Sequence, residues 1–379
     1  MMRIRFQNEP YTYLFPVGLL SAVLGAILWL LFQMQIISFY PRAAHGHLMY
    51  FGFLWSYIAG FLMTAIPKMT QSKSARSWEI LVAIGLVCGQ VFLNYTNQLE
   101  YVSFVTVAQM VFIIVFVARR FFMTQIIPFS GFVFLPVALV AGFLGSLIQV
   151  WSFSQNTIVN LPIILNQAFV LNLICGLGSR LIPVLSRLPQ AINPDVVDHK
   201  KQLKEIVLVL VFLNLGFVFE AFNYFQLGSF VKFLSVFYIS FRFFKIHQRP
   251  TVNTFLGWGL RVSIVTMLIG YLLSAILMEL NSLATMHLVF IGSFTAITIL
   301  ISTRVTLAHG GLALDFELTT KTLVLVTLCF VISAISRMLA GLNVLSLYIV
   351  TSIAFYLLGL LLWSWKLIKP LLKINANKV

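Results

Sequence analysis

Long apolar stretches alternate with short polar segments along the whole chain. A helix that crosses a bilayer needs about 20 mostly apolar residues, and twelve stretches meet or approach that length. They span 12–38, 47–66, 78–94, 100–118, 130–151, 159–182, 205–222, 226–241, 254–280, 284–308, 321–342 and 344–366. The eighth is the weakest, because it is short and interrupted by Lys232. The pattern predicts an all-α fold, a polytopic bundle of about 12 transmembrane helices in one domain, 1–379.

The polar connections predict how the bundle is oriented. The longest, 183–204, divides the chain into two six-span halves, 1–190 and 191–379. Eighteen basic residues lie in the connections on one side and only Arg42 on the other. The eighteen are Arg3, Arg5, Lys68, Lys73, Arg76, Arg119, Arg120, Arg187, Lys200, Lys201, Lys204, Arg242, Lys245, Arg249, Lys366, Lys369, Lys373 and Lys378. Because positive residues are retained in the cytoplasm, both termini are expected there. The loop 309–320 fits least well, since it contains Asp315 and Glu317 and no basic residue.

Composition supports a membrane setting. Of the 379 residues, 60% are hydrophobic and 9% charged, whereas about a quarter of the residues in a soluble domain are charged. The net charge of +15 could indicate nucleic acid, but the basic residues lie between apolar stretches, so the expected partner is the lipid bilayer. Cys88, Cys175 and Cys329 each lie inside an apolar stretch, which argues against a disulfide framework or a thiolate zinc site.

Three histidines lie where spans enter the membrane on the side predicted to be extracytoplasmic. His45 and His47 precede or begin the second span, and His287 begins the tenth. The pattern His-Leu-x-aromatic-x-Gly runs from His47 to Gly52 and recurs from His287 to Gly292. Each glycine would let another helix or a planar ligand approach. Because imidazole is a common ligand of haem and copper, these histidines are candidate metal ligands; the alternative is that they cap the starts of helices.

Helix geometry limits how these histidines can act together. On a regular helix His45 and His47 point about 200° apart, so both face the interior only if His45 lies in a preceding turn. His309 is 22 residues after His287, which is about 33 Å along one helix. His309 therefore cannot ligate the same ion as His287, although it remains a candidate ligand elsewhere.

A second group of candidate residues lies at the cytoplasmic ends of the spans. Arg180, Arg304 and His309 end the sixth and tenth spans, and arginine can bind an anion such as a haem propionate through two hydrogen bonds. The alternative is that these arginines only anchor the helices at lipid headgroups. Among the other intramembrane charges, Arg337 would form a buried pair with one of the glutamates predicted near the outer side. Those glutamates are Glu100, Glu220 and Glu279.

Three stretches of the chain resemble the NnrS family. They contain all four candidate histidines, and the twelve-span length is also similar to that family. The stretches are His45 to Phe53 with Gly60 to Pro67, then Gly178 to Pro183, and His287 to Gly310. The resemblance implies a multi-pass protein of the bacterial inner membrane that contains haem and copper and acts in the response to nitric oxide.

The leading hypothesis joins this resemblance to the histidine pattern. His47 and His287, with His45 as a third candidate, would ligate haem or copper near the periplasmic face, and a small gaseous or anionic molecule would be the ligand. One alternative is a transporter for a small anion, haem or a metal chelate, which would use Arg180, Arg304 and Arg337. Others are a haem–copper oxidase-like subunit without the usual binuclear copper site, and a non-catalytic sensor or assembly factor.

Overall fold

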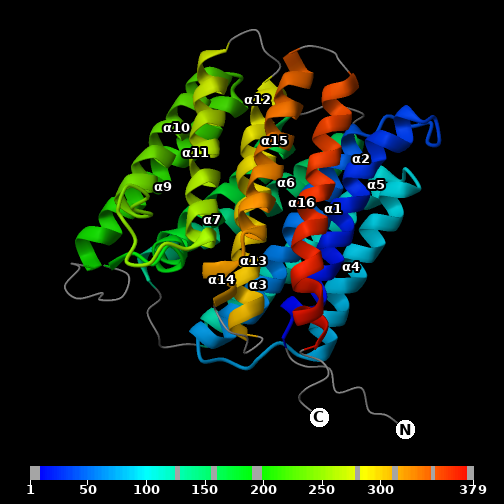
Figure 1. The fold of residues 1–379 in the computed structure, drawn as a ribbon. Coiled ribbons are helices and arrows are strands. Elements are labelled where there is room, and N and C mark those ends of the chain that lie inside the picture. Colours follow the sequence, from blue (N-terminus) through cyan, green and yellow to red (C-terminus); the bar gives the residue numbers. More distant parts are fainter. Residues whose placement is uncertain are drawn as a thin grey trace.

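The structure is a computed structural model, and every regular element that it describes is helical (Figure 1). It describes residues 9–123, 129–154, 160–189, 199–277, 282–309, 315–342 and 346–373. The first half of the chain contains α1 (Tyr11–Gln33), α2 (Arg42–His47), η1 (Leu48–Leu54), α3 (Trp55–Met69), α4 (Ser77–Tyr95), α5 (Leu99–Phe121), η2 (Ser130–Val133), α6 (Phe134–Ser154) and α7 (Leu161–Leu185). The second half contains α9 (His199–Ala221), α10 (Phe225–Arg242), α11 (Phe255–Ile276), α12 (Ser282–Val289), η3 (Phe290–Thr295), α13 (Ala296–His309), α14 (Asp315–Thr319), α15 (Thr322–Leu342) and α16 (Ser346–Lys373).

The polytopic bundle predicted from the sequence is confirmed. Eleven helical segments in the described part of the chain are long and apolar enough to cross a membrane, with α2, η1 and α3 forming one of them and α12, η3 and α13 another. The exception among the predicted spans is α10, which has 18 residues, contains Lys232, and packs against α9 and α11. The start of α1 and the end of α16 lie at the same end of the bundle (Figure 1). α10 runs beside α9 and α11 in the bundle, and its crossing of the membrane stays a prediction from the sequence.

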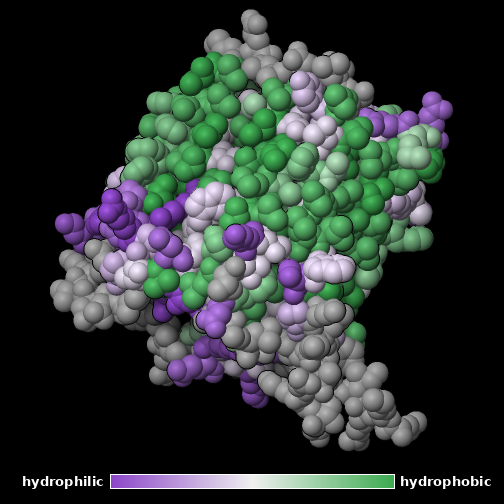
Figure 2. Space-filling view, viewed as in Figure 1, coloured by the Kyte–Doolittle hydropathy of each residue, from purple (hydrophilic) through white to green (hydrophobic). Residues whose placement is uncertain are grey.

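The surface of the bundle is divided between an apolar band and polar ends. Hydrophobic residues cover most of the face seen in Figure 2, while hydrophilic residues gather in its lower part and near α2. We call the end that holds Tyr11 and Lys373 the proximal end, and the opposite end the distal end. Placing the proximal end in the cytoplasm stays a prediction from charge, and Arg3, Arg5 and Lys378, which contribute to it, lie outside the described residues.

The two copies of the repeated histidine motif adopt the same rare conformation. The π-helix η1 begins directly after His47, and the π-helix η3 begins three residues after His287. A π-turn displaces the normal helical hydrogen bonds and is frequent at functional sites. Side chains bond the carbonyls there: Gln109 donates to the Phe51 oxygen over 3.2 Å, and the Thr295 hydroxyl donates to the Phe290 oxygen over 3.0 Å. The repeat therefore extends from sequence into backbone geometry.

The glycine in each motif serves helix packing. A Cβ added to Gly52 would lie 2.9 Å from the Cβ of Ser21 on α1, and one added to Gly292 would lie 2.5 Å from the Cγ2 of Thr266 on α11. Both distances are too short for real carbon contacts. Of the two interpretations that the sequence left open, the close approach of another helix is the one found at both positions.

Candidate histidine site

His45 and His47 point in opposite directions because both belong to the same short helix, α2. His45 faces α1, where its Nδ1 lies 2.9 Å from the Gly25 carbonyl oxygen. His47 faces α4 and α6, where its ring contacts Asn94 and Gln149. The angular separation expected for a regular helix is therefore found, and the two imidazoles do not enter one pocket together.

His47 is held in a cluster of buried amide side chains. Its Nδ1 lies 3.2 Å from Asn94 Oδ1, and its Nε2 is in a short contact with the Gln149 amide. Asn94 donates its own N–H to the Gln90 carbonyl oxygen over 2.8 Å, which turns its oxygen toward His47. Gln90 in turn donates to the His47 carbonyl oxygen over 2.9 Å, and Gln109 donates to Gln90 over 3.3 Å. Both ring nitrogens of His47 are therefore already partnered.

His45 and His287 share a different arrangement, with Nδ1 bonded to a backbone carbonyl. The acceptor for His287 is Leu283, one turn earlier on α12, at 2.6 Å, and the acceptor for His45 is Gly25. A carbonyl oxygen can only accept, so Nδ1 carries the proton and Nε2 keeps its lone pair. Within the described part of the chain, neither Nε2 has a hydrogen-bond partner. This tautomer, with Nδ1–H bonded to a carbonyl, is the one that presents Nε2 to a metal.

The structure brings these two histidines together at the distal end with one cation. His45 and His287 lie near each other, and Arg337 on α15 lies near both, close enough for its positive charge to disfavour protonation of either imidazole. Aromatic rings surround them: Trp29 meets the His45 ring at 5.9 Å between centroids, and Phe290 meets the His287 ring at 5.9 Å. We call His45, His287 and Arg337 the open cluster.

The two π-helices meet beside this cluster. The Tyr50 ring on η1 packs edge-on against Phe290 on η3 with centroids 5.9 Å apart, and its buried hydroxyl has no hydrogen-bond partner in the described structure. An aromatic wall next to imidazole lone pairs that have no hydrogen-bond partner suits a porphyrin or a copper ion in an apolar setting.

The open cluster offers two imidazole ligands. Among the described residues, no three His, Cys, Asp or Glu side chains come together in a way that could hold a metal ion. Two neutral imidazoles could hold a haem iron or a copper ion of low coordination number, which would supply the redox chemistry when bound. The donor set thus fits a haem or copper site with two histidines, and it does not supply a site built from three such ligands.

The proximal candidates Arg180, Arg304 and His309 are engaged separately. Arg304 donates to both carboxylate oxygens of Glu317 at 3.0 and 2.9 Å. His309 Nδ1 lies 2.5 Å from the ammonium of Lys68. Arg180 is exposed, and its guanidinium lies 5.3 Å from the centre of the Phe129 ring. No contact among the described residues joins the three.

Glu317 also explains why the loop 309–320 fits the charge pattern poorly. Its carboxylate is fully buried and pairs with Arg304 and, at 3.8 Å, with Arg187. Glu317, which lies on α14 within this loop, therefore neutralises basic residues of neighbouring segments. Its negative charge is used in an ion pair.

A buried ion pair lies between α9 and α10, and the sequence did not predict that its two members pair with each other. Lys232 is fully buried, and its Nζ lies 2.6 Å from Glu220 Oε1 and donates to Gln167 Oε1 over 3.0 Å. Gln167 donates to the Tyr271 hydroxyl over 3.3 Å and to the Met286 sulfur over 3.1 Å. The sequence did contain evidence for this pair, because a lysine inside one span and a glutamate inside the preceding span each cost free energy unless they are paired.

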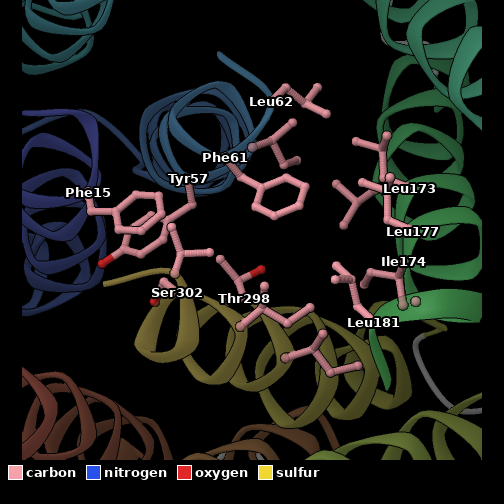
Figure 3. Close-up of a pocket in the computed structure, with 16 residues that line it drawn as sticks. Phe15, Tyr57, Phe61, Leu62, Leu173, Ile174, Leu177, Leu181, Thr298 and Ser302 are labelled. Carbon is pink, nitrogen blue, oxygen red and sulfur yellow. The ribbon is translucent and has the colours of Figure 1, made fainter. Parts of the chain in front are cut away.

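An apolar pocket lies apart from the open cluster, between α1, α3, α7 and α13 (Figure 3). Phe61, Leu173 and Leu177 point into it, and Thr298 and Ser302 provide the nearby hydroxyls. The pocket contains no titratable group other than Tyr57, whose ring stacks on Phe15 at 4.7 Å. It therefore has the character of a packing defect or an apolar ligand site, and it offers no ligand to a metal.

Comparison with known proteins finds one family whose sequence model matches the chain. The sequence model of a family described as "NnrS protein" matches residues 5–374, which is nearly the whole chain. No curated protein matches the chain. The match includes every candidate histidine and every helix that the structure describes.

Proposed function

The chain belongs to the NnrS family, and on that premise we propose that His45 and His287 bind a haem iron or a copper ion at the distal end. The protein would then serve in defence against nitric oxide or in related redox chemistry. The membrane would be the bacterial inner membrane, with the open cluster near its periplasmic face. This proposal keeps the haem or copper centre expected from the sequence, and it assigns the ligands to His45 and His287 ahead of His47.

One observation carries the choice of ligands. His45 and His287 each hold Nδ1 on a backbone carbonyl and leave Nε2 without a partner in the described structure, whereas His47 has both nitrogens bonded to amides. The carbonyl bond fixes the orientation and the tautomer of each imidazole and makes it more basic toward a metal. The metal itself would supply the binding of nitric oxide or the transfer of an electron when it is bound.

The residues around the pair would control access to the metal. Trp29 packs against the His45 ring and Phe290 against the His287 ring, so each imidazole would have an aromatic neighbour that keeps water from one side of it. Exclusion of water lets a small uncharged molecule such as nitric oxide partition from the lipid into the site.

Spectra of the purified protein test this proposal. After haem-replete expression, reduced-minus-oxidised spectra should show a Soret band, or copper should be present in stoichiometric amount. Either His45→Ala or His287→Ala should remove the signal. The matched control is His247→Ala, because the His247 ring only stacks on Phe241 at 5.4 Å in a connection outside the spans. A wild-type protein with neither haem nor copper would refute the proposal.

A further inference from the structure

Arg337 is the one member of the open cluster that the proposed metal site leaves unexplained. It lies within the span Thr322–Gly341 and is half-buried. Among the described residues no carboxylate pairs with it: Glu220 is taken by Lys232, Glu100 is exposed, and Glu279 lies outside that part of the chain. The buried pair that the sequence suggested between Arg337 and one of these three glutamates is therefore not formed among the described residues. An unpaired guanidinium within a span is costly and is a functional candidate by default.

Close packing fixes the position of Arg337 beside His287. A Cβ added to Gly341 would lie 2.2 Å from the Cβ of Ala284, so α15 and α12 are in direct contact there. The same added Cβ would lie 4.0 Å from Arg337 Nη1, which places the guanidinium along this face of α15. Because the two helices run in opposite directions, Arg337, one turn before Gly341, faces the level of His287, nearly one turn after Ala284.

The electrostatics of this place favour an anion. Arg337 is positive, the two imidazoles nearby are neutral donors of lone pairs, and the Tyr40 hydroxyl also lies near the guanidinium. A guanidinium presents two parallel N–H groups that match the two oxygens of a carboxylate or of nitrite. In a region of low dielectric constant, such a charge-assisted pair is stronger than in water.

We propose that Arg337 binds a planar anion with two oxygens in the open cluster, next to the imidazoles of His45 and His287. Two sources share this chemistry: a propionate carboxylate of a bound haem, and a free small oxyanion such as nitrite. The haem source rests on the proposed function, whereas the free oxyanion does not. In both cases Arg337 is a binding residue for the anion and the histidines are its neighbours.

The first arm of the test uses sodium nitrite and protein without haem. Trp29 packs against His45, so its fluorescence or the heat of titration should report binding. Arg337→Gln should weaken nitrite binding by at least about tenfold, because hydrogen bonds to a charged group are lost. Arg337→Lys should retain part of the affinity. The matched control is Arg42→Gln, an exposed arginine on the same short helix as His45, which should leave binding unchanged.

The second arm uses haem and haem dimethyl ester, in which both carboxylates are blocked. If a propionate is the anion, the ester should bind the wild-type protein about as weakly as haem binds Arg337→Gln, and the variant should no longer distinguish the two. If haem and its dimethyl ester bind the wild-type protein with equal affinity while nitrite binding requires Arg337, the free oxyanion is the ligand. Unchanged affinities for both nitrite and haem in Arg337→Gln would overturn the inference.

The proposed metal site and the proposed anion site can be refuted independently of each other. A wild-type protein that binds nitrite through Arg337 but takes up no haem or copper would refute the metal site and support the anion site. The opposite result is a Soret band that depends on His45 and His287, with affinities for nitrite and haem that Arg337→Gln leaves unchanged. It would support the metal site and refute the anion site.

Discussion

Two polar regions share the distal half of the bundle and differ in how completely their side chains are partnered. In the partnered region, His47 is surrounded by amides, and Lys232 pairs with Glu220 and Gln167. In the open cluster, two imidazole nitrogens and a guanidinium have no bonding partner among the described residues. A buried polar group without a partner costs free energy. Removing one member of the partnered region would therefore leave its partner buried and unbonded, whereas the open cluster has two imidazole nitrogens and a guanidinium free to bind a ligand.

The largest change in stability is expected in the partnered region, at Lys232. Replacing it by Met leaves the Glu220 carboxylate buried and unpaired, and breaking a buried ion pair costs about 3–5 kcal/mol. The free energy of unfolding in mixed micelles should fall by about that amount. The double variant Lys232→Met with Glu220→Gln should recover much of the loss, because the remaining amide can still bond to Ser229. A single variant as stable as wild type but unable to bind haem would place Lys232 in the binding site.

A smaller loss of stability is expected for His47→Leu. The substitution leaves the amides of Asn94 and Gln149 without their imidazole partner, at a cost of about 1–3 kcal/mol. Haem or copper content should stay near the wild-type level in protein that is folded. Loss of the chromophore without loss of stability would show that His47 belongs with the ligands, as the motif alone suggested, and would remove the distinction between the two regions.

In contrast to His47→Leu, His287→Ala should lose the cofactor and keep most of its stability. It removes one hydrogen bond to the Leu283 carbonyl, worth about 1 kcal/mol, so protein without cofactor should unfold at nearly the wild-type midpoint. The Soret band or the bound copper should be lost. Cofactor should also raise the unfolding midpoint of wild type but not of the variant, because only the native site binds it. Equal stabilisation of both proteins would contradict the assignment of His287 as a ligand.

The smallest effect is expected at the proximal end, for His309→Gln. His309 is partly exposed and contacts Lys68 and, at 4.0 Å, Glu9, and exposed pairs of this kind contribute about 0–1 kcal/mol. Neither the unfolding midpoint nor the spectrum should change measurably. A loss of haem or copper in this variant would reveal a second centre at the proximal end and would limit the comparison above to one of two sites.

The spans could be predicted from the sequence because the thickness of the bilayer sets the apolar length that each spanning helix needs. Each helix needs an apolar stretch of similar size wherever it lies in the fold, so local composition was sufficient for eleven of them. The same rule made the stretch around Lys232 the weakest prediction. Lys232 is accommodated there because Glu220 and Gln167 come from α9 and α7, and such a pairing depends on helix contacts that composition does not encode.

The positions of the candidate histidines along their spans could be predicted from the sequence, whereas the contacts of each imidazole could not. The repeated motif placed His47 and His287 at the start of two spans, and the helical angle separated His45 from His47. The motif could not show that Asn94 and Gln149 bond His47, since they lie 47 and 102 residues away in the chain. It also could not show that Gly25 and Leu283 orient the other two imidazoles.

By itself, the sequence determined the helical class and the approximate limits of eleven spans, and it placed His45, His47 and His287 near one end of the bundle. These follow from hydrophobic length and from the position of a residue within its own helix. Only the tertiary structure decided which ring nitrogens are occupied, that Arg304 pairs with Glu317, and that Arg337 lies beside His287 without an acidic partner in the described residues. The reason is physical: hydrogen bonds and ion pairs reach only a few ångströms, so their partners are chosen by the packing of helices that are distant in the chain.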